Sequence, residues 1–418
     1  MKKFIVAAIF LIAYTAHAQT LVPAKPEQAG LSAERLTRVD ELVTNYVTSE
    51  RIPGAVVLIA RNGKIVHHKA YGYSNIENKT PLKVNDIFRI ASQTKAVTSL
   101  AAMMLFEEGK FLLDEPVSKY IPESKTPRVL VNFKEKAPNY FTDPAKSEPT
   151  IRQLLIHTSG IDYAGIGSKE GKAIFAKAGV PSGIGNHQGL LADKMKILAK
   201  LPLKHHPGER YTYGLNTDVL GYLVEIWSGQ SLDQFFKTRI FAPLGMNDTY
   251  FYLPKEKHSR LVALYETKDG KLVQPSGYIY DGAQPNYPTL AGTYYSGGAG
   301  LSSTIEDYAK FLQLFINGGI YNGKRLLSRK TIELMLTNQV QPPLTTQFGL
   351  GFGLETTVND HQSILTIGSF SWGGAFNTQY WGDQKEKLVG LIFTNMYNSP
   401  VRDTGEKFKI ATYQAIND

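Results

Sequence analysis

Ser92 and Lys95 stand three positions apart in the segment Ser92-Gln93-Thr94-Lys95, and no other serine in the chain has a lysine at this spacing. Residues three apart on a helix share one face, so the amine of the second can approach the hydroxyl of the first. A serine hydroxyl becomes a useful nucleophile when a neighbouring base takes its proton, and a buried lysine can be that base. The spacing therefore predicts acyl transfer through a serine nucleophile.

The residues that follow the pair predict the helix that must position it. Residues 96–106 are apolar almost all round, and Gly109 is a typical helix stop. If Ser92 were only a helix cap and Lys95 only a solvated side chain, the helix would have a polar face. A buried helix starting at Ser92 also directs free backbone N–H groups and a positive dipole end at a developing oxyanion.

Other catalytic schemes find less support in the sequence. The chain has no Gly-x-Ser-x-Gly segment, no His-Glu-x-x-His segment and no cysteine. This argues against a nucleophile elbow, a zinc protease site, a thiolate nucleophile and disulfides. We expect structural roles for the histidines, with no metal and no cofactor. Those that stand out are His67, His68, His157, His205 and His206.

The N-terminus has the pattern of a secretory signal peptide. Lys2 and Lys3 precede an apolar run over residues 4–14, and Ala16-His17-Ala18 has the small-x-small form of a cleavage site. The run is too short to cross a bilayer, which requires about 20 apolar residues. We therefore expect residues 1–18 to be removed, the protein to be periplasmic or secreted, and no stable membrane anchor to remain.

Composition is typical of a globular chain. Of its 418 residues 43% are hydrophobic and 20% are charged, which allows one large core or two lobes that share a cleft. The formal net charge is +9, but the basic residues are scattered and no basic run is interleaved with aromatic residues. The pattern argues against nucleic-acid binding.

Periodicity predicts strands and helices near both ends of the chain. Residues 32–48 have the apolar spacing of one helix face, with Ser32 as cap, and Asn62-Gly63 predicts a tight hairpin between two early strands. Late in the chain, a helix, two core strands and a closing helix are expected. These early and late elements cover residues 55–60, 65–71, 304–317, 376–380, 388–394 and 404–416.

The middle of the chain shows little strand character. Residues 117–229 contain helical stretches, one of them over residues 217–227, and loops rich in Gly and Pro. We therefore predict a discontinuous sheet domain formed by residues 19–116 and 230–418, interrupted by a mostly helical domain formed by residues 117–229.

These motifs together resemble the serine β-lactamase and penicillin-binding-protein superfamily, and the likeness covers nearly the whole mature chain. The closest type is the class C branch with its carboxylesterase and D-aminopeptidase relatives. The resemblance implies an α/β (α+β) fold, an antiparallel sheet flanked by helices plus a mostly helical domain. The matching segments are Arg89-Ile90-Ala91 with the Ser-x-x-Lys helix, residues 154–160, residues 207–213 and residues 300–304.

The family's second motif, Tyr-x-Asn, has two candidates. Tyr73-Ser74-Asn75 is a literal copy, but it precedes the nucleophile on a predicted strand. The family's tyrosine comes after Ser-x-x-Lys, where this chain has Tyr213-Gly214-Leu215. The resemblance implies that the Tyr213 phenol shuttles protons beside Lys95. Leu215 replaces the family's Asn, and we expect Asn216, one position further, to point elsewhere.

The family's third motif, Lys-Thr-Gly on the edge strand, corresponds to Trp372-Gly373-Gly374, followed by Ala375. The resemblance implies that substrate lies against this strand and that the Ala375 N–H completes an oxyanion hole with the Ser92 N–H. An indole offers apolar area and one donor where the family's lysine offers a cation for the carboxylate of a β-lactam. This departure and Leu215 favour the esterase branch.

We therefore expect an exported carboxylesterase that forms an acyl-enzyme on Ser92. The alternative within enzymes is a β-lactamase, a D-Ala-D-Ala carboxypeptidase or a D-aminopeptidase. The partner would be a small-molecule ester, a β-lactam or a D-amino-acid peptide, and no oligomeric state is indicated. The alternative of another class is a catalytically inactive peptidoglycan-binding module. The joint presence of Ser92, Lys95 and Tyr213 argues against it.

Overall fold

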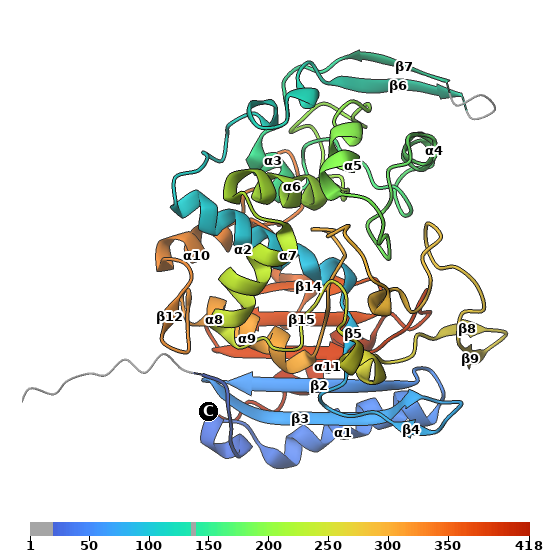
Figure 1. The fold of residues 1–418 in the computed structure, drawn as a ribbon. Coiled ribbons are helices and arrows are strands. Elements are labelled where there is room, and N and C mark those ends of the chain that lie inside the picture. Colours follow the sequence, from blue (N-terminus) through green and yellow to red (C-terminus); the bar gives the residue numbers. More distant parts are fainter. Residues whose placement is uncertain (1–19, 135–138) are drawn as a thin grey trace, which may run out of the picture.

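The computed structural model describes residues 20–134 and 139–418. A lobe built on a sheet carries a second lobe above it (Figure 1). The predicted signal peptide, residues 1–18, lies outside the described residues. Within them, no helix is both long and apolar enough to cross a membrane.

The bounds of the elements are as follows. The helices are α1 (Ala33–Thr48), α2 (Thr94–Glu107), α3 (Ile151–Leu155), α4 (Lys169–Ala178), α5 (Leu191–Leu198), α6 (Asn216–Ser228), α7 (Leu232–Phe235), α8 (Ala242–Leu244), α9 (Ile305–Ile316), α10 (Arg329–Met335) and α11 (Thr404–Tyr413). The strands are β1 (Val22–Pro23), β2 (Gly54–Arg61), β3 (Lys64–Asn75), β4 (Thr80–Pro81), β5 (Phe88–Arg89), β6 (Arg128–Lys134), β7 (Asn139–Pro144), β8 (Glu266–Lys268), β9 (Lys271–Val273), β10 (Ser302–Ser303), β11 (Ile320–Tyr321), β12 (Lys324–Arg325), β13 (Gly353–Leu354), β14 (Phe370–Gly374), β15 (Thr378–Asp383) and β16 (Leu388–Phe393).

The central sheet joins the two ends of the chain. Its strand order is β1-β3-β2-β16-β15-β14-β13, and all of these pairs are antiparallel except β1 with β3. The early hairpin β2–β3 turns at Asn62 and Gly63, both of which have positive φ, as predicted. The late hairpin β15–β16 pairs directly with β2. The predicted antiparallel sheet is confirmed.

Strand β2 is buried on both of its faces, which explains its unbroken apolar sequence. Ala55, Val57 and Ile59 belong to one hydrophobic cluster with residues of α1 and α11, while Val56 and Leu58 face a second cluster that includes α2 and α9. Alternate residues of a strand point to opposite faces, so helices on both sides require apolar residues at every position.

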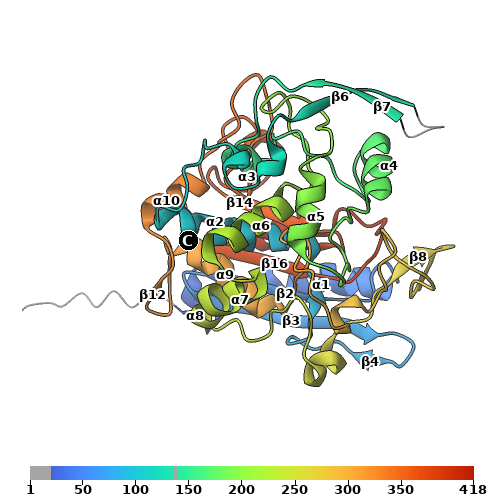
Figure 2. The same cartoon turned by 45° about the horizontal axis from the view of Figure 1, so that its top comes forward.

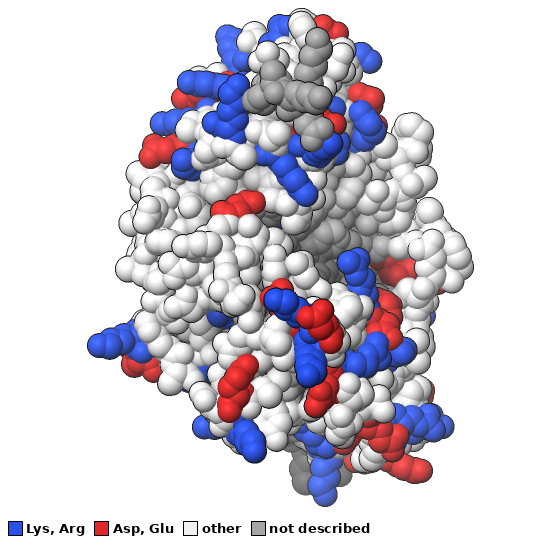
Figure 3. Space-filling model, turned by 90° about the vertical axis from the view of Figure 1, so that its right-hand side faces the viewer, with Lys and Arg blue, Asp and Glu red and all other residues white. Residues whose placement is uncertain are grey.

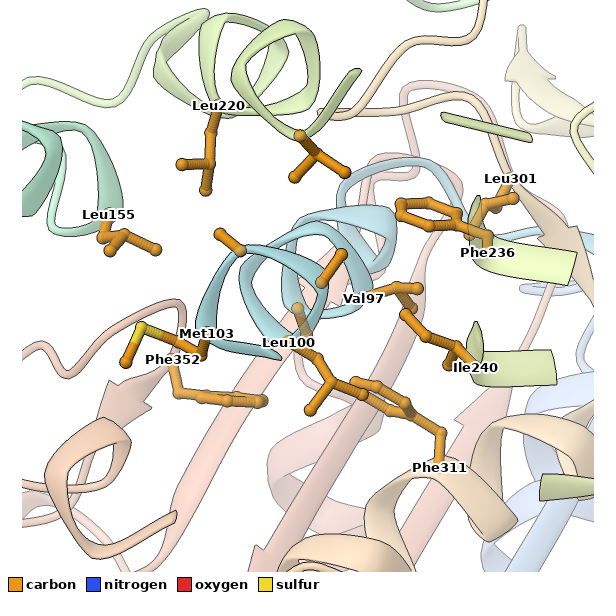
Figure 4. Packing of buried hydrophobic residues seen from close by; sticks show 14 of the residues in the cluster. Val97, Leu100, Met103, Leu155, Leu220, Phe236, Ile240, Leu301, Phe311 and Phe352 are labelled. Atoms are coloured by element: carbon orange, nitrogen blue, oxygen red, sulfur yellow. The ribbon is translucent and has the colours of Figure 1, made fainter. Parts of the chain in front are cut away.

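Helix α2 lies between the two lobes, as the two views show (Figure 1, Figure 2). Leu155 of α3 and Leu220 of α6 pack above it, and Phe311 of α9 packs below it (Figure 4). Every residue from Thr94 to Leu105 is buried. This position between lobes explains why the helix carries no polar face, and it confirms the predicted buried helix after Ser92.

The segment over residues 117–229 contains α3, α4, α5 and α6, and it also contains the hairpin β6–β7, which the sequence analysis did not predict. The hairpin extends along the top of the molecule in Figure 1. Most residues of β7 are exposed, so the strand carries no clear two-sided pattern of apolar and polar residues. The domain boundaries stay a prediction.

Arg61, at the end of β2, forms hydrogen bonds with residues near both ends of the described chain. Its guanidinium donates to the carbonyls of Ala29 and Gly30 and to the carboxylate of Asp418, the last residue, at 2.8 Å. It also forms an ion pair of 2.7 Å with Glu386 in the β15–β16 turn. Arg61 is only 6% exposed, so these contacts satisfy a cation that is largely removed from water.

Candidate active site

Ser92 lies in a short 3₁₀ helix, Ala91–Gln93, that leads directly into α2. The residue before it, Ala91, has a φ of 40°, a backbone conformation that residues other than glycine rarely adopt. Such strain persists only where surrounding contacts enforce it, and it is concentrated at functional sites. Ser92 is 8% exposed. Its N–H stands in the first turn, where backbone N–H groups have no acceptor within the helix.

Tyr213 comes from the other lobe, in the loop before α6, and its hydroxyl donates a hydrogen bond of 2.7 Å to Ser92 Oγ. Its ring is held on three sides. The ring centroids of His157, Tyr163 and Trp372 lie 4.9, 5.6 and 5.6 Å from that of Tyr213. The structure thus brings together the predicted nucleophile and the predicted phenol.

Lys95 is 3% exposed, and its amine lies 4.6 Å from the centroid of the Tyr213 ring. The amine donates to the Gly298 carbonyl at 2.8 Å and contacts the Tyr163 hydroxyl at 3.5 Å. These are its hydrogen-bond partners among the described residues, so its direct partner is not Ser92, which instead accepts from Tyr213. Lys95 therefore stands behind the Ser92–Tyr213 pair, beside the phenol ring.

Strand β14 brings Trp372, Gly373 and Gly374 beside the Ser92 turn. A Cβ atom on Gly374 would lie 2.4 Å from the Ile90 carbonyl, so only glycine allows this close approach. Ala375, which follows β14, is partly buried and packs against the hydrophobic cluster that contains Ala91. The structure thus gathers Ser92 and the predicted oxyanion and substrate-binding residues into one region.

Strand β14 was expected at the edge of the sheet, but β13 adds a short outer strand. Its two residues pair only with Phe370 and Ser371. Trp372, Gly373 and Gly374 therefore have no strand on that side in the described sheet. The part of β14 next to Ser92 keeps a free edge, along which a substrate can lie.

Trp372 forms one wall beside the reactive group. Its ring contacts Tyr213, and the centroid of its ring lies 5.2 Å from that of Phe348 in an edge-to-face arrangement.

Leu215 is completely buried, and Asn216 bonds to Ser159 and lies 3.1 Å from His157 Nδ1. Asn216 therefore points away from the nucleophile, as expected from its shift of one position.

His157, treated above as a structural histidine, packs directly behind Tyr213. Burial, with a smaller contribution from the charge of Lys95, holds the pKa of His157 well below its ordinary value. The imidazole is therefore neutral, and its Nδ1 accepts from the Asn216 amide. His157 also has a positive φ of 57°, and its carbonyl accepts from the Thr212 N–H at 2.8 Å. It thus supports the segment that carries Tyr213.

Tyr163 and Asp218 were missed in the sequence analysis, although both lie at the site. Tyr163 stacks on Tyr213 and touches the Lys95 amine, and burial raises its pKa well above the ordinary value. Asp218 is completely buried in the first turn of α6. A carboxylate in such an apolar helix is itself a signal, because an isolated buried charge is costly. Tyr163 has no comparable local signal.

The molecule is hollowed on the side where α4 and the β8–β9 hairpin lie, and Lys and Arg side chains gather above the hollow (Figure 3). A cavity of about 490 Å³ lies on the α4 side, and Ala164, directly after Tyr163, is part of its wall. The further residues that line this cavity include Gly165, Lys172, Val180, Pro181 and Asp281. As a separate point, no group of three or more His, Cys, Asp or Glu side chains among the described residues could hold a metal ion.

A family model described as Beta-lactamase matches residues 39–414. The chain belongs to the beta-lactamase family. Protein Rv1367c of Mycobacterium tuberculosis is 33% identical over 81% of this chain and 85% of its own length. Esterase EstB of Burkholderia gladioli is 28% identical over 87% of this chain and 91% of its own length.

Among solved structures, EstCE1, described as a hydrolase with promiscuous acyltransferase activity, superimposes with a TM-score of 0.78. It is 26% identical in sequence, and the match covers 91% of this chain and 99% of that chain. The resemblance stated above and the expected fold class are thereby confirmed. This beta-lactamase family chain is a serine hydrolase.

Proposed function

We propose that this chain is a carboxylesterase that acts through an acyl-enzyme on Ser92. The observation that carries the proposal is the hydrogen bond of 2.7 Å from Tyr213 to Ser92 Oγ, with the buried Lys95 amine beside the phenol. A hydroxyl acts as a nucleophile when a positioned group relays its proton away. In the proposed mechanism Tyr213 and Lys95 share this task, with the phenol bonded to Ser92 Oγ and the amine beside the phenol ring.

The proposed reaction has two stages. Ser92 Oγ attacks the ester carbonyl, its proton passes to the Tyr213 and Lys95 pair, and the N–H groups of Ser92 and Ala375 bind the oxyanion. The same pair then protonates the leaving alcohol as the carbon–oxygen bond breaks. In the second stage the pair takes a proton from water, the resulting hydroxide attacks the acyl-enzyme, and the acid leaves as Ser92 regains its proton.

The walls of the site favour an ester over a β-lactam. Trp372 supplies apolar area where the family's lysine would supply a cation, and Leu215 is buried in the core rather than facing the substrate. A carboxylate-bearing substrate would lack a charged partner from these two positions. The names of the relatives EstB and EstCE1, an esterase and a hydrolase, support the same choice.

Turnover of p-nitrophenyl acetate and butyrate tests the nucleophile. Ser92→Ala should abolish turnover and labelling by a fluorophosphonate probe, because no other proposed residue can carry the acyl group. Ser99→Ala is the matched control, a buried serine on the same helix. Turnover retained in Ser92→Ala, or absence of labelling in the wild-type protein, would contradict the proposal.

A substrate panel tests the choice of ester. It comprises short p-nitrophenyl esters, a chromogenic cephalosporin and a D-Ala-D-Ala peptide, and we expect esters to have the highest kcat/KM. Faster hydrolysis of the cephalosporin or the peptide would instead support a β-lactamase or a cell-wall peptidase with the same nucleophile. The wild type and Ser92→Ala must be compared on every substrate, so that background hydrolysis is subtracted.

We also infer that the protein is exported, on the strength of the N-terminal pattern over residues 1–18. Expression of the full chain in a bacterial host should yield a periplasmic or secreted product that begins at Gln19. N-terminal sequencing or intact-mass measurement would show this. A product that keeps its first eighteen residues would contradict the inference.

A further inference from the structure

Asp218 is a completely buried carboxylate near the reactive group. The Ser296 hydroxyl donates to its Oδ1 at 2.6 Å, whereas its Oδ2 has no hydrogen-bond partner among the described residues. A buried carboxylate that is not fully hydrogen-bonded destabilises a protein unless an opposite charge compensates it. A cation near Oδ2 would supply that charge.

The cation is Lys95, on the other side of Gly298. The Gly298 carbonyl accepts from the Lys95 amine at 2.8 Å. A Cβ atom on Gly298 would lie 2.3 Å from Asp218 Oδ2 and 3.4 Å from Lys95 Nζ. Both charged atoms thus border the same small volume, which only a glycine leaves free. Opposite charges separated by about 4–6 Å favour each other's ionised forms.

The other titratable groups around Asp218 and Lys95 are three tyrosines and one histidine, namely Tyr163, Tyr294, Tyr213 and His157. Burial raises the pKa of Tyr163 and of Tyr294 well above the ordinary value, and it lowers the pKa of His157 well below. Tyr213 presents its ring to Lys95 and its hydroxyl to Ser92. Burial also raises the pKa of Asp218 itself, whereas the Ser296 hydroxyl, the charge of Lys95 and the backbone N–H groups of Gly298 and Asp218 act against that rise.

We propose that Asp218 is a positioning residue that, through its negative charge and the Ser296–Gly298 loop, orients the Lys95 amine beside the Tyr213 phenol. The inference rests on the proposed role of Lys95 in proton transfer. It adds an acidic group from α6 to the machinery. Asp218 acts on the reaction only through Lys95.

Asp218→Asn tests the proposal, because the amide keeps the shape and a hydrogen bond to Ser296 but removes the charge. With p-nitrophenyl butyrate, we expect kcat to fall about tenfold or more with KM little changed. The acidic limb of the pH profile of kcat/KM should move to lower pH by about one pH unit or more, because the variant removes a buried negative charge next to the groups that transfer protons.

Ser296→Ala provides a second variant, since loss of the hydroxyl makes the Asp218 carboxylate less stable as an anion. It should move the acidic limb in the same direction by a smaller amount. Glu225→Gln is the matched control, a half-buried carboxylate on the same helix whose pKa burial also raises. Its pH profile should equal that of the wild type, and thermal unfolding shows that each variant is folded.

The proposal is overturned if folded Asp218→Asn or folded Ser296→Ala keeps the wild-type pH profile, or if Glu225→Gln moves it equally. Its failure differs from failure of the proposed function. If only the proposal for Asp218 fails, Ser92→Ala is inactive while Asp218→Asn behaves as wild type. If the proposed function fails, Ser92→Ala itself stays active.

Discussion

The Tyr213 hydroxyl donates a hydrogen bond to Ser92 Oγ although 121 positions separate the two residues in the sequence. Ser92 belongs to the turn before α2, and Tyr213 belongs to the loop before α6. Helices α2 and α6 pack against each other, so the hydrogen bond depends on the contact between two helices from different lobes. The reactive pair therefore exists only in the folded chain.

Tyr213→Phe should lower kcat for p-nitrophenyl butyrate by about 10²–10⁴-fold, the usual range for loss of a general acid–base group. The ring and its contacts with His157, Tyr163 and Trp372 are kept, so the midpoint of thermal unfolding should hardly change. Tyr211→Phe is the control, because it removes the hydroxyl of a neighbouring tyrosine that packs on His157 but does not bond to Ser92. Equal losses in both variants would contradict the role of Tyr213.

Trp372→Lys should lower kcat/KM for p-nitrophenyl butyrate by about tenfold or more, because a solvated cation replaces apolar area beside the substrate. The same change should raise the rate on a chromogenic cephalosporin relative to the ester, since the new ammonium can pair with its carboxylate. Trp372→Phe keeps an aromatic wall, so its effect on the ester should be smaller. An unchanged ratio of the two rates in Trp372→Lys would exclude Trp372 as a determinant of substrate choice.

These site predictions differ in how far local sequence supports them. Ser92 and Lys95 form a short motif within one helical turn, so periodicity alone places them at the start of a buried helix. The partner of Lys95 is Gly298, which lies on a distant loop that no local pattern connects to α2. Tyr163 likewise meets Tyr213 only through tertiary packing. Contacts of this kind depend on the whole fold.

The same distinction applies to the fold. The hairpin at Asn62-Gly63 and the Ser32 cap of α1 both follow local chemistry, and the structure confirms each of them. Hairpin β6–β7 has no strong pattern because most of β7 is exposed. The two-residue strand β13 is too short for any periodicity to predict it. Sequence patterns report burial, and these strands are little buried or very short.

His67 predicts a loss of stability in acid. Burial, partly opposed by Asp40, lowers the pKa of His67 from its ordinary value of 6.5 to about 4. Between pH 6.5 and pH 4 the unfolded chain is therefore protonated at this histidine while the folded chain is not. The free energy of unfolding that is present above pH 6.5 is consequently lost as the pH falls toward 4. The loss is at most about 3.5 kcal/mol, at about 1.4 kcal/mol per pH unit over about 2.5 pH units.

His67→Gln should remove this part of the acid sensitivity, because a glutamine does not titrate. Urea unfolding at pH 7 and pH 4.5 would measure the difference between the wild type and the variant. His361→Gln, at an exposed histidine, should leave the difference unchanged. If His67→Gln loses as much stability in acid as the wild type, the histidine is not the cause.

Arg61→Ala should lower the free energy of unfolding by about 2–3 kcal/mol, because it leaves the carboxylate of Glu386 and two backbone carbonyls without their buried donor. Chemical denaturation would measure the loss. Arg329→Ala, which breaks an exposed ion pair with Glu333, should have little effect. If both variants are equally stable, the contacts that Arg61 makes near the two ends of the described chain do not stabilise the protein.

The pairing of β2 with β16 has a consequence for biosynthesis. Strand β2 emerges from the ribosome early, but its neighbour in the sheet is made only when about nine-tenths of the chain exists. Until then the central sheet lacks β16, and one edge of β2 has no strand to pair with. A nascent chain thus carries Ser92 without the assembled pocket, so the hydrolase acquires its activity only after β14 and β16 have been made.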